Sequence, residues 1–261
     1  MCIFSDGAKN EDTTSKVEQV IAYLKTVDGF ESVTIFESNR NKGLANSIID
    51  GVTTILESNE SIIVLEDDLI TSSNFLGFMN QALAFYENDE NIFSISGFTL
   101  DLPSLPGTND YYFGYRASSW GWGIWKSRWT VIDWNVEDYS SFIKDKESRK
   151  RFNRGGSDMS KMLKNQMEGC IDSWAIRFCY YQFSSELKTV FPTVSKVKSI
   201  GFGNDATHTS GTTRFFSKLD KENKQVFKFD LYQGMDNQLV TEFASKFSIY
   251  SRLKDKIKQF F

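Results

Sequence analysis

The stretch SIIVLEDDL, residues 61–69, decides the expected fold, because an apolar run ends there in three consecutive carboxylates. A continuous apolar run of this length predicts a strand that is buried on both faces of a sheet. Adjacent carboxylates repel one another, and a divalent cation with hard oxygen ligands relieves that repulsion. The stretch therefore predicts a buried strand that delivers Glu66, Asp67 and Asp68 to a site for Mn²⁺ or Mg²⁺.

A second interpretation of the same acids stays open. In it, Asp67 and Asp68 begin the following helix, where acidic residues interact favourably with the helix dipole. Thr71, Ser72 or Ser73 then caps that helix. The position at a strand end, with an Asn-Lys-Gly sequence after the preceding predicted strand, favours the metal site.

The first hundred residues alternate strand-like runs with amphipathic helical patterns. Strands are predicted for four β-branched or aromatic runs, at residues 2–5, 33–37, 62–65 and 92–96. Apolar residues at helical spacing predict helices over 44–56 and 75–86. This βαβαβ order predicts an α/β fold with a mostly parallel sheet flanked by helices. Ligands bind beyond the carboxyl ends of such strands, so residues 38–43 and 66–68 are expected to face one crevice.

The overall composition narrows the classes of function. A net charge of -4 and a pI near 5.3 provide no basic field for nucleic acid, so no nucleic-acid partner is expected. Three cysteines without a CxxC spacing argue against a disulfide framework or a zinc ribbon, and a single histidine argues against a histidine-rich zinc site. Carboxylate chemistry is therefore favoured.

The sequence also bears on the location of the protein. Residues 1–7 have neither a charged n-region nor a long apolar h-region, and no apolar stretch approaches the roughly 18 residues of a spanning helix. The cysteine usage suits a reducing compartment. These features predict a protein that is cytoplasmic or peripheral at the inner face of the membrane.

The last part of the chain, residues 213–261, contains a basic amphipathic pattern. Its apolar residues recur at helical spacing: Phe243, Phe247, Tyr250, Leu253, Ile257 and Phe260. The basic residues lie mostly elsewhere around the predicted helix: Lys246, Arg252, Lys254, Lys256 and Lys258. Two roles stay open for it: the apolar stripe packs on the domain, or the helix lies on an anionic membrane surface.

Five motifs follow one another along the chain in an order typical of one enzyme family. They are IFSDG (3–7), NKGLA (41–45), LEDD (65–68), SWGWGIWKSRW (119–129) and IDSWA (171–175). With them, the sequence resembles bacterial GT-A glycosyltransferases of the family 2 type, which are related to the N-acetylglucosaminyltransferase I family. The resemblance spans about residues 2–210.

The resemblance implies a GT-A, Rossmann-like domain over residues 1–212, with a nucleotide-sugar half (1–100) and an acceptor half (101–212). It implies inverting, metal-dependent transfer of a sugar from a nucleotide-diphosphate donor, commonly a UDP-sugar. The implied acceptor is a glycan or lipid-linked glycan in surface polysaccharide assembly. GT-A chains normally open with one more strand that carries a donor-binding loop, so the expected sheet lacks its usual first strand.

The donor-side residues take their roles from the same resemblance. Asp68 is expected to ligate the metal, and Glu66 and Asp67 to serve the ribose and the donor sugar of an EDD version of the DxD motif. Asp6 is expected to contact the uracil. Asn41 and Lys42 match the donor-side loop less closely, and Trp122 belongs to a segment that lines the donor sugar in the family.

Two further residues have a functional and a structural interpretation. Asp172 lies where the relatives keep the general base that deprotonates the acceptor hydroxyl, but it also precedes residues 174–178 as a helix N-cap would. His208 lies where many GT-A enzymes have a late histidine near the metal or diphosphate, although a lone histidine is more often structural.

Two other functions stay open at this point. A nucleotidyltransferase uses similar acids on a similar fold, but it ordinarily has a Gly-rich, basic phosphate loop near the first strand, and none is visible in the sequence. A sugar-binding or scaffold protein that descends from a transferase is the non-catalytic alternative.

Overall fold

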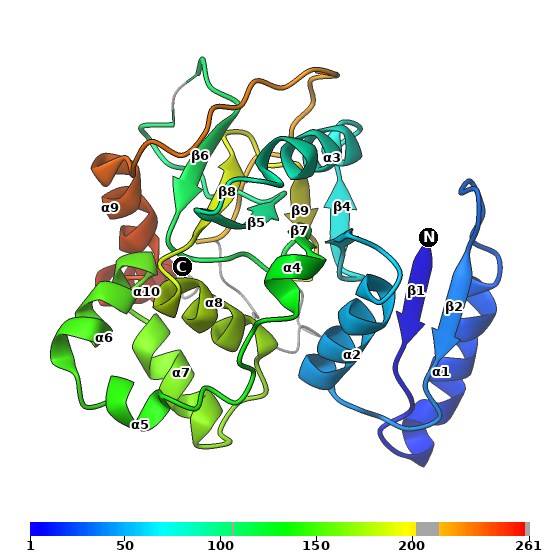
Figure 1. Ribbon diagram of the computed structural model, residues 1–261. Coiled ribbons are helices and arrows are strands. Elements are labelled where there is room, and N and C mark those ends of the chain that lie inside the picture. Colours follow the sequence, from blue (N-terminus) through cyan, green and yellow to red (C-terminus); the bar gives the residue numbers. More distant parts are fainter. Residues whose placement is uncertain (106, 202–213, 259–261) are drawn as a thin grey trace.

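The computed structural model describes residues 1–105, 107–201 and 214–258 (Figure 1). The strands are β1 (Cys2–Ser5), β2 (Thr34–Glu37), β3 (Ser61–Val64), β4 (Leu69–Thr71), β5 (Ile92–Ser96), β6 (Tyr111–Gly114), β7 (Trp122–Trp125), β8 (Lys188–Pro192) and β9 (Val197–Ser199). The longer helices are α1 (Glu11–Leu24), α2 (Leu44–Leu56), α3 (Phe75–Tyr86), α7 (Met159–Met167), α8 (Trp174–Ser184), α9 (Asn237–Lys246) and α10 (Ile249–Lys258). The short ones are α4 (Lys126–Trp129), α5 (Tyr139–Phe142), α6 (Lys146–Phe152) and the 3-10 turn η1 (Asn153–Gly155).

The main sheet has five strands in the order β3-β7-β5-β8-β6, so the α/β class is confirmed. The prediction of a mostly parallel sheet is wrong. Only β5 and β8 run parallel, while β7 lies antiparallel between β3 and β5. The first-half strands β3 and β5 are therefore separated by a strand from the second half of the chain. Local periodicity cannot reveal this insertion, because the pairing residues lie far apart in the sequence.

Each face of the five-stranded sheet is covered by its own apolar cluster. One cluster joins α3 to β5 and β8 and continues to α9. The other joins α2, α7 and α8 to the opposite face, with Trp122 and Trp174 among its largest fully buried side chains. Strand β7 contributes side chains to both clusters, because successive side chains of a strand point to opposite faces: Trp125 belongs to the first cluster and Trp122 to the second. The result is a three-layer arrangement of helices, sheet and helices.

Strands β1 and β2 pair in parallel with each other and form a separate two-stranded sheet. Figure 1 shows this pair at one side of the molecule, beside α1, with α2 between it and the main sheet. Within the described ranges, neither β1 nor β3 pairs on its second edge. The prediction that residues 62–65 are buried on both faces is wrong: Ile62, Ile63 and Val64 are only partly buried, because β3 is an edge strand.

The acidic run is followed by a strand and not by a helix, so the second interpretation of Asp67 and Asp68 is wrong. Strand β4 pairs antiparallel with β9, and α3 begins only at Phe75 after Asn74. The main-chain N–H of Ser72 donates to the Lys196 carbonyl at 2.8 Å, which extends the pairing by one step. This small sheet brings residues 195–201 to the acidic run.

A buried ion pair anchors the β9 region from its other side. The Lys196 ammonium contacts the Asp220 carboxylate, and both side chains are almost fully buried. Asn74 donates to the same carboxylate at 3.0 Å, and these contacts hold the pKa of Asp220 below its usual range despite burial. Removing one partner of such a pair leaves an unpaired buried charge, so Asp220 is tied to Lys196 beside β9 and to Asn74 at the start of α3.

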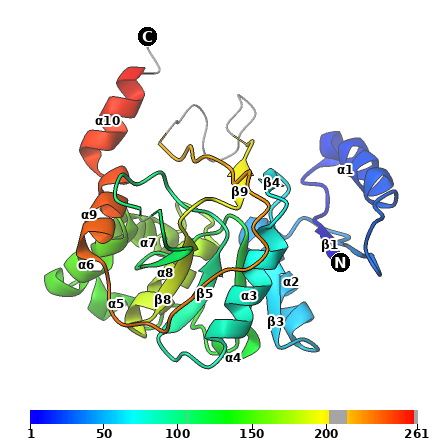
Figure 2. The ribbon, with the colours of Figure 1, turned by 90° about the horizontal axis from the view of Figure 1, so that it is seen from above.

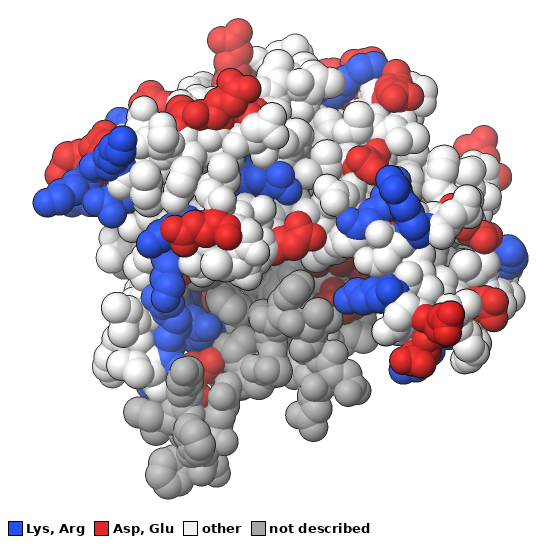
Figure 3. Space-filling view, turned by 90° about the horizontal axis from the view of Figure 1, so that it is seen from below, with Lys and Arg blue, Asp and Glu red and all other residues white. Residues whose placement is uncertain are grey.

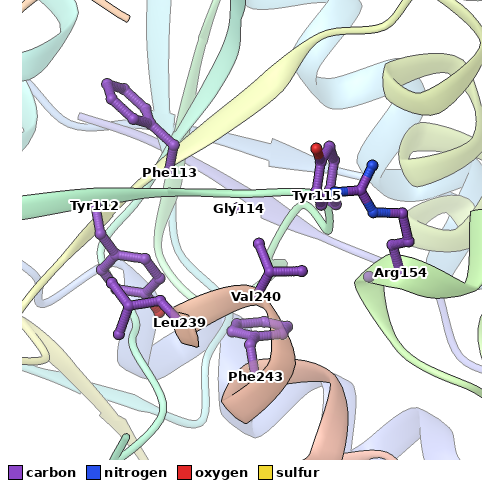
Figure 4. A pocket seen from close by; sticks show the side chains of 9 residues that line it. Tyr112, Phe113, Gly114, Tyr115, Arg154, Leu239, Val240 and Phe243 are labelled. Carbon is purple, nitrogen blue, oxygen red and sulfur yellow. The ribbon is translucent and has the colours of Figure 1, made fainter. Parts of the chain in front are cut away.

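The C-terminal pattern forms two helices instead of one. Helix α9 packs on the domain, with Leu239, Phe243 and Phe247 buried. Figure 4 shows Leu239, Val240 and Phe243 facing Tyr112 of β6, and the remaining cavity of about 10 Å³ is too small for a sugar. Helix α10 starts after Ser248, whose side chain accepts from the Ser251 N–H at 3.1 Å. None of the described helices is long and apolar enough to cross a membrane.

Candidate active site

The acidic run forms a tight turn directly beyond β3. The Leu69 N–H donates to the Glu66 carbonyl at 3.3 Å, and the chain then enters β4. Asp68 is held from two sides: the Ile200 N–H donates to its main-chain carbonyl at 2.8 Å, and the Ser199 hydroxyl donates to Oδ2 at 3.0 Å. The β4–β9 pairing therefore positions the Asp68 carboxylate before any ligand binds.

The other carboxylate oxygen of Asp68, Oδ1, is buried and has no hydrogen-bond partner among the described residues. A buried charged oxygen without a donor is costly, and such groups are ordinarily paired or coordinated. Gly201 lies so close that a Cβ on it would come 2.1 Å from Asp68 Oδ2. The chain thus leaves one carboxylate oxygen free for a cation while it packs its backbone tightly around the other.

Glu66 shows that, among the described residues, negative charge dominates at this turn. Burial, followed by the nearby charges of Asp68 and Asp67, raises the pKa of Glu66 to about 7. A bound cation lowers the pKa of Glu66 again, because it stabilises the ionised carboxylates. Within the described ranges, no three His, Cys, Asp or Glu side chains form a complete ligand set. His208, the other predicted metal ligand, lies outside the described residues. Asp68 and Glu66 thus fit a hard divalent cation that is completed by a ligand's own oxygens or by water.

Gly201→Ala is expected to weaken Mn²⁺ binding roughly 10–100-fold, the usual effect of disturbing the contacts that orient a metal ligand. The added Cβ displaces the Asp68 carboxylate from Ser199, because the carboxylate is the part that can move. Titration calorimetry with Mn²⁺ measures the effect. Gly107→Ala is the matched control, since no atom lies within 4 Å of a Cβ there. Equal affinities for the two variants would contradict the proposed role of this contact.

The ends of β1 and β2 meet at one edge of their sheet and interlock. The Asp6 carboxylate accepts from the N–H groups of Gly7 and Lys42 at 2.9 Å and from the N–H of Gly43 at 3.1 Å. The Asn41 side chain donates back to the Gly7 carbonyl at 2.8 Å. The structure therefore brings together Asp6, Asn41 and Lys42, but it uses Asp6 and Asn41 to hold the loop.

A groove runs beside this loop, with a volume of about 230 Å³. Its walls include the stacked rings of Phe4 and Phe36, whose centroids are 4.5 Å apart, and the paired side chains of Lys42 and Asp50. Ligand pockets for small molecules usually measure about 300–1,000 Å³, so the groove alone is small for a whole nucleotide-sugar. The acidic run does not line it, so the single crevice expected for residues 38–43 and 66–68 is not formed by this groove.

Asp172 approaches the first turn of α2. Its Oδ2 accepts from the Ala45 N–H at 3.4 Å and lies 3.1 Å from the position of a Cβ on Gly43. The alternative interpretation of Asp172 as a helix N-cap is wrong, because Ser173 caps α8 and accepts from the Ile176 N–H. The side chain of Asp172 is exposed and thus has access to an acceptor. No hydrogen bond or ion pair links it to residues 66–68 among the contacts of the described chain.

Trp122 lies in the core and not at a ligand surface. Its side chain is 1% exposed and packs on Trp129, Trp174 and Phe178. The ring is out of reach of a donor sugar, so the predicted donor contact of Trp122 has no support in the structure. Trp120, two residues earlier, is only partly buried and packs edge-on against Phe98.

Sequence reasoning missed Ser199 and Gly201, which contact Asp68. No motif signals them, because their importance comes from the β4–β9 pairing across more than a hundred residues. The only hint in the sequence is the position of Gly201 at the start of GFGND, seven residues before His208. Comparison with known proteins adds no assignment: no family model and no curated protein matches this chain.

Proposed function

We propose that this chain is an inverting, metal-dependent glycosyltransferase of GT-A architecture that uses a nucleotide-diphosphate sugar, with a UDP-sugar as the first candidate. One observation carries the proposal: the acidic turn beyond β3 holds a pre-positioned Asp68, one of whose buried oxygens has no hydrogen-bond donor among the described residues, beside a Glu66 whose pKa is raised by burial and by the neighbouring acids. A cation bound with the diphosphate would both contact the buried oxygen of Asp68 and offset the negative charge of the turn.

The residues of the chain have distinct tasks in this proposal. Asp68, with Glu66 beside it, holds a Mn²⁺ or Mg²⁺ ion, which supplies charge neutralisation for the diphosphate when it is bound. Asp6 and Asn41 fix the 40–43 loop, and the Lys42 ammonium of this loop pairs with Asp50 in the wall of the groove. Asp172 takes the proton of the acceptor hydroxyl as that oxygen bonds to the anomeric carbon and the nucleotide diphosphate leaves with the bond electrons.

The acceptor assigned in this proposal is a glycan or a lipid-linked glycan, processed on the cytoplasmic side of the membrane. The exposed position of Asp172 supports a large acceptor, because the base has to reach a hydroxyl that arrives from solvent. The α/β layering of the main sheet is compatible with a GT-A domain.

Thermal denaturation with Mn²⁺ and a panel of nucleotides tests the proposal. A nucleotide diphosphate at 100 times its dissociation constant is expected to raise Tm by roughly 5–10 °C, because it stabilises the fold by about 2.7 kcal/mol. The shift requires Mn²⁺ or Mg²⁺ and is absent with nucleosides. A nucleotidyltransferase instead responds to nucleoside triphosphates and releases pyrophosphate. If no nucleotide diphosphate shifts Tm, with or without metal, the proposal is wrong for this chain.

A further inference from the structure

Helix α10 presents its apolar side chains to solvent. Ile249, Tyr250 and Leu253 are 69%, 74% and 55% exposed. They lie on one side of the helix, because Leu253 follows Tyr250 by three residues and Ile249 by four. A surface helix normally turns such a stripe towards the core. Here the opposite side faces the protein: Asp255 is buried and pairs with Arg214 at 3.3 Å, and the Ser251 hydroxyl donates to the Ser245 carbonyl at 2.7 Å.

The charges around this stripe are positive, although the whole chain is acidic. Arg252 and the exposed Lys254 flank the stripe, and the acid of α10, Asp255, is engaged with Arg214 beneath the helix. Figure 3 shows Lys and Arg side chains gathered at the end of the molecule where α10 lies, and Figure 2 shows α10 extending away from the other helices. Solvent-exposed apolar side chains between basic ones form the pattern of a helix that lies in a membrane interface.

We propose that α10 docks this protein on an anionic lipid bilayer. The apolar side chains of Ile249, Tyr250 and Leu253 enter the interface, while Arg252 and Lys254 contact the negatively charged headgroups. A second copy of the chain fits this surface less well, because a two-fold contact between two such helices would bring two sets of basic side chains into one interface. Asp255 and Ser251 lie on the protein-facing side of α10, and their contacts hold the apolar stripe towards solvent before any membrane binds. This inference does not depend on the proposed enzymatic activity.

Vesicle flotation of the full chain tests the docking. The protein is expected to float with phosphatidylcholine vesicles that contain 25% phosphatidylglycerol. It is expected to remain unbound with pure phosphatidylcholine vesicles, and binding should weaken at high salt because exposed charges are then screened. Lys254→Gln should reduce the partition constant about fivefold, the usual effect of one basic residue near an anionic surface. Lys16→Gln on the exposed face of α1 is the matched control and should leave binding unchanged.

The apolar contribution is tested separately. Combined substitution of Ile249, Tyr250 and Leu253 by Ser is expected to lower the partition constant at least about 100-fold, because several apolar side chains no longer enter the interface. Val226→Ser with Leu231→Ser, which removes exposed apolar side chains elsewhere, should have no effect. The proposal would be overturned if the protein bound neutral vesicles equally well, or if the triple variant bound anionic vesicles fully. It would also be overturned if vesicles bound neither form and sedimentation equilibrium showed a dimer that the triple variant abolishes.

Discussion

Asp68→Asn protein is expected to fold normally and to lose its metal-dependent response to nucleotide diphosphates. The amide oxygen of Asn can still accept from the Ser199 hydroxyl, so the turn keeps its shape. Its amide nitrogen replaces the free oxygen, and an NH₂ group cannot ligate a hard cation. We expect the Mn²⁺-dependent affinity for nucleotide diphosphate to fall at least about 100-fold, since the loss of a direct ligand exceeds the 10–100-fold effect of its supporting contacts. Titration calorimetry at fixed Mn²⁺ measures it.

Asp67→Asn is the matched control for this experiment. It makes the same change of charge one residue earlier, on a side chain that is exposed and makes no hydrogen bond among those described. Its metal response should persist, with a smaller loss of affinity. The metal-free melting temperature of Asp68→Asn should equal or exceed that of the wild type, because one charge of a repelling group is removed. If both variants lose the response equally, total charge and not coordination explains the effect, and Asp68 is not the ligand.

Asp172→Asn protein is expected to bind donor as the wild type does and to transfer sugar 10²–10⁴ times more slowly, the usual contribution of a general base. An Asn side chain still accepts from the Ala45 N–H at the start of α2, so the geometry persists while the basic group is lost. Single-turnover transfer assays measure the rate, and equilibrium titration of the nucleotide-sugar measures the donor affinity separately from it.

Ser173→Ala provides the contrast, because Ser173 caps α8 next to Asp172. Its loss should lower the free energy of unfolding by about 1 kcal/mol and leave the transfer rate of the folded protein unchanged. Unchanged turnover in Asp172→Asn would remove Asp172 as the base. A loss of donor affinity in that variant would instead assign it to holding the α2 terminus.

Local patterns in the sequence correctly indicated four of the five strands in the first hundred residues and missed β4. Residues 2–5, 34–37, 61–64 and 92–96 are strands, and the helices over 44–56 and 75–86 have the expected bounds. Each of these elements has a clear hydrophobic period within about a dozen residues, which is sufficient to specify a strand or a helix. The pairing of β1 with β2 also follows from local order, since α1 connects them as a crossover.

The chain beyond residue 100 was less predictable, because β6 and β7 are rich in aromatic residues and lack a clear hydrophobic period. Strand β7 lies inside the motif SWGWGIWKSRW, where apolar residues are almost continuous and no period distinguishes strand from loop. The long charged stretch at residues 136–151 forms two short helices, α5 and α6, with a turn between them. Phe142 and Phe152, the last residues of α5 and α6, pack against each other and against Tyr180.

The sequence by itself determined that three carboxylates follow an apolar strand, and this part of the candidate site stands as expected. Only the tertiary structure decided which oxygen is free, because Ser199 and Gly201 reach Asp68 through the pairing of β4 with β9. The tertiary structure also made the sheet mixed and β3 an edge, since β7 inserts from a distant part of the chain. Periodicity reports how one segment distributes its own apolar side chains, whereas strand order and the burial of a single oxygen depend on which remote segment packs against it.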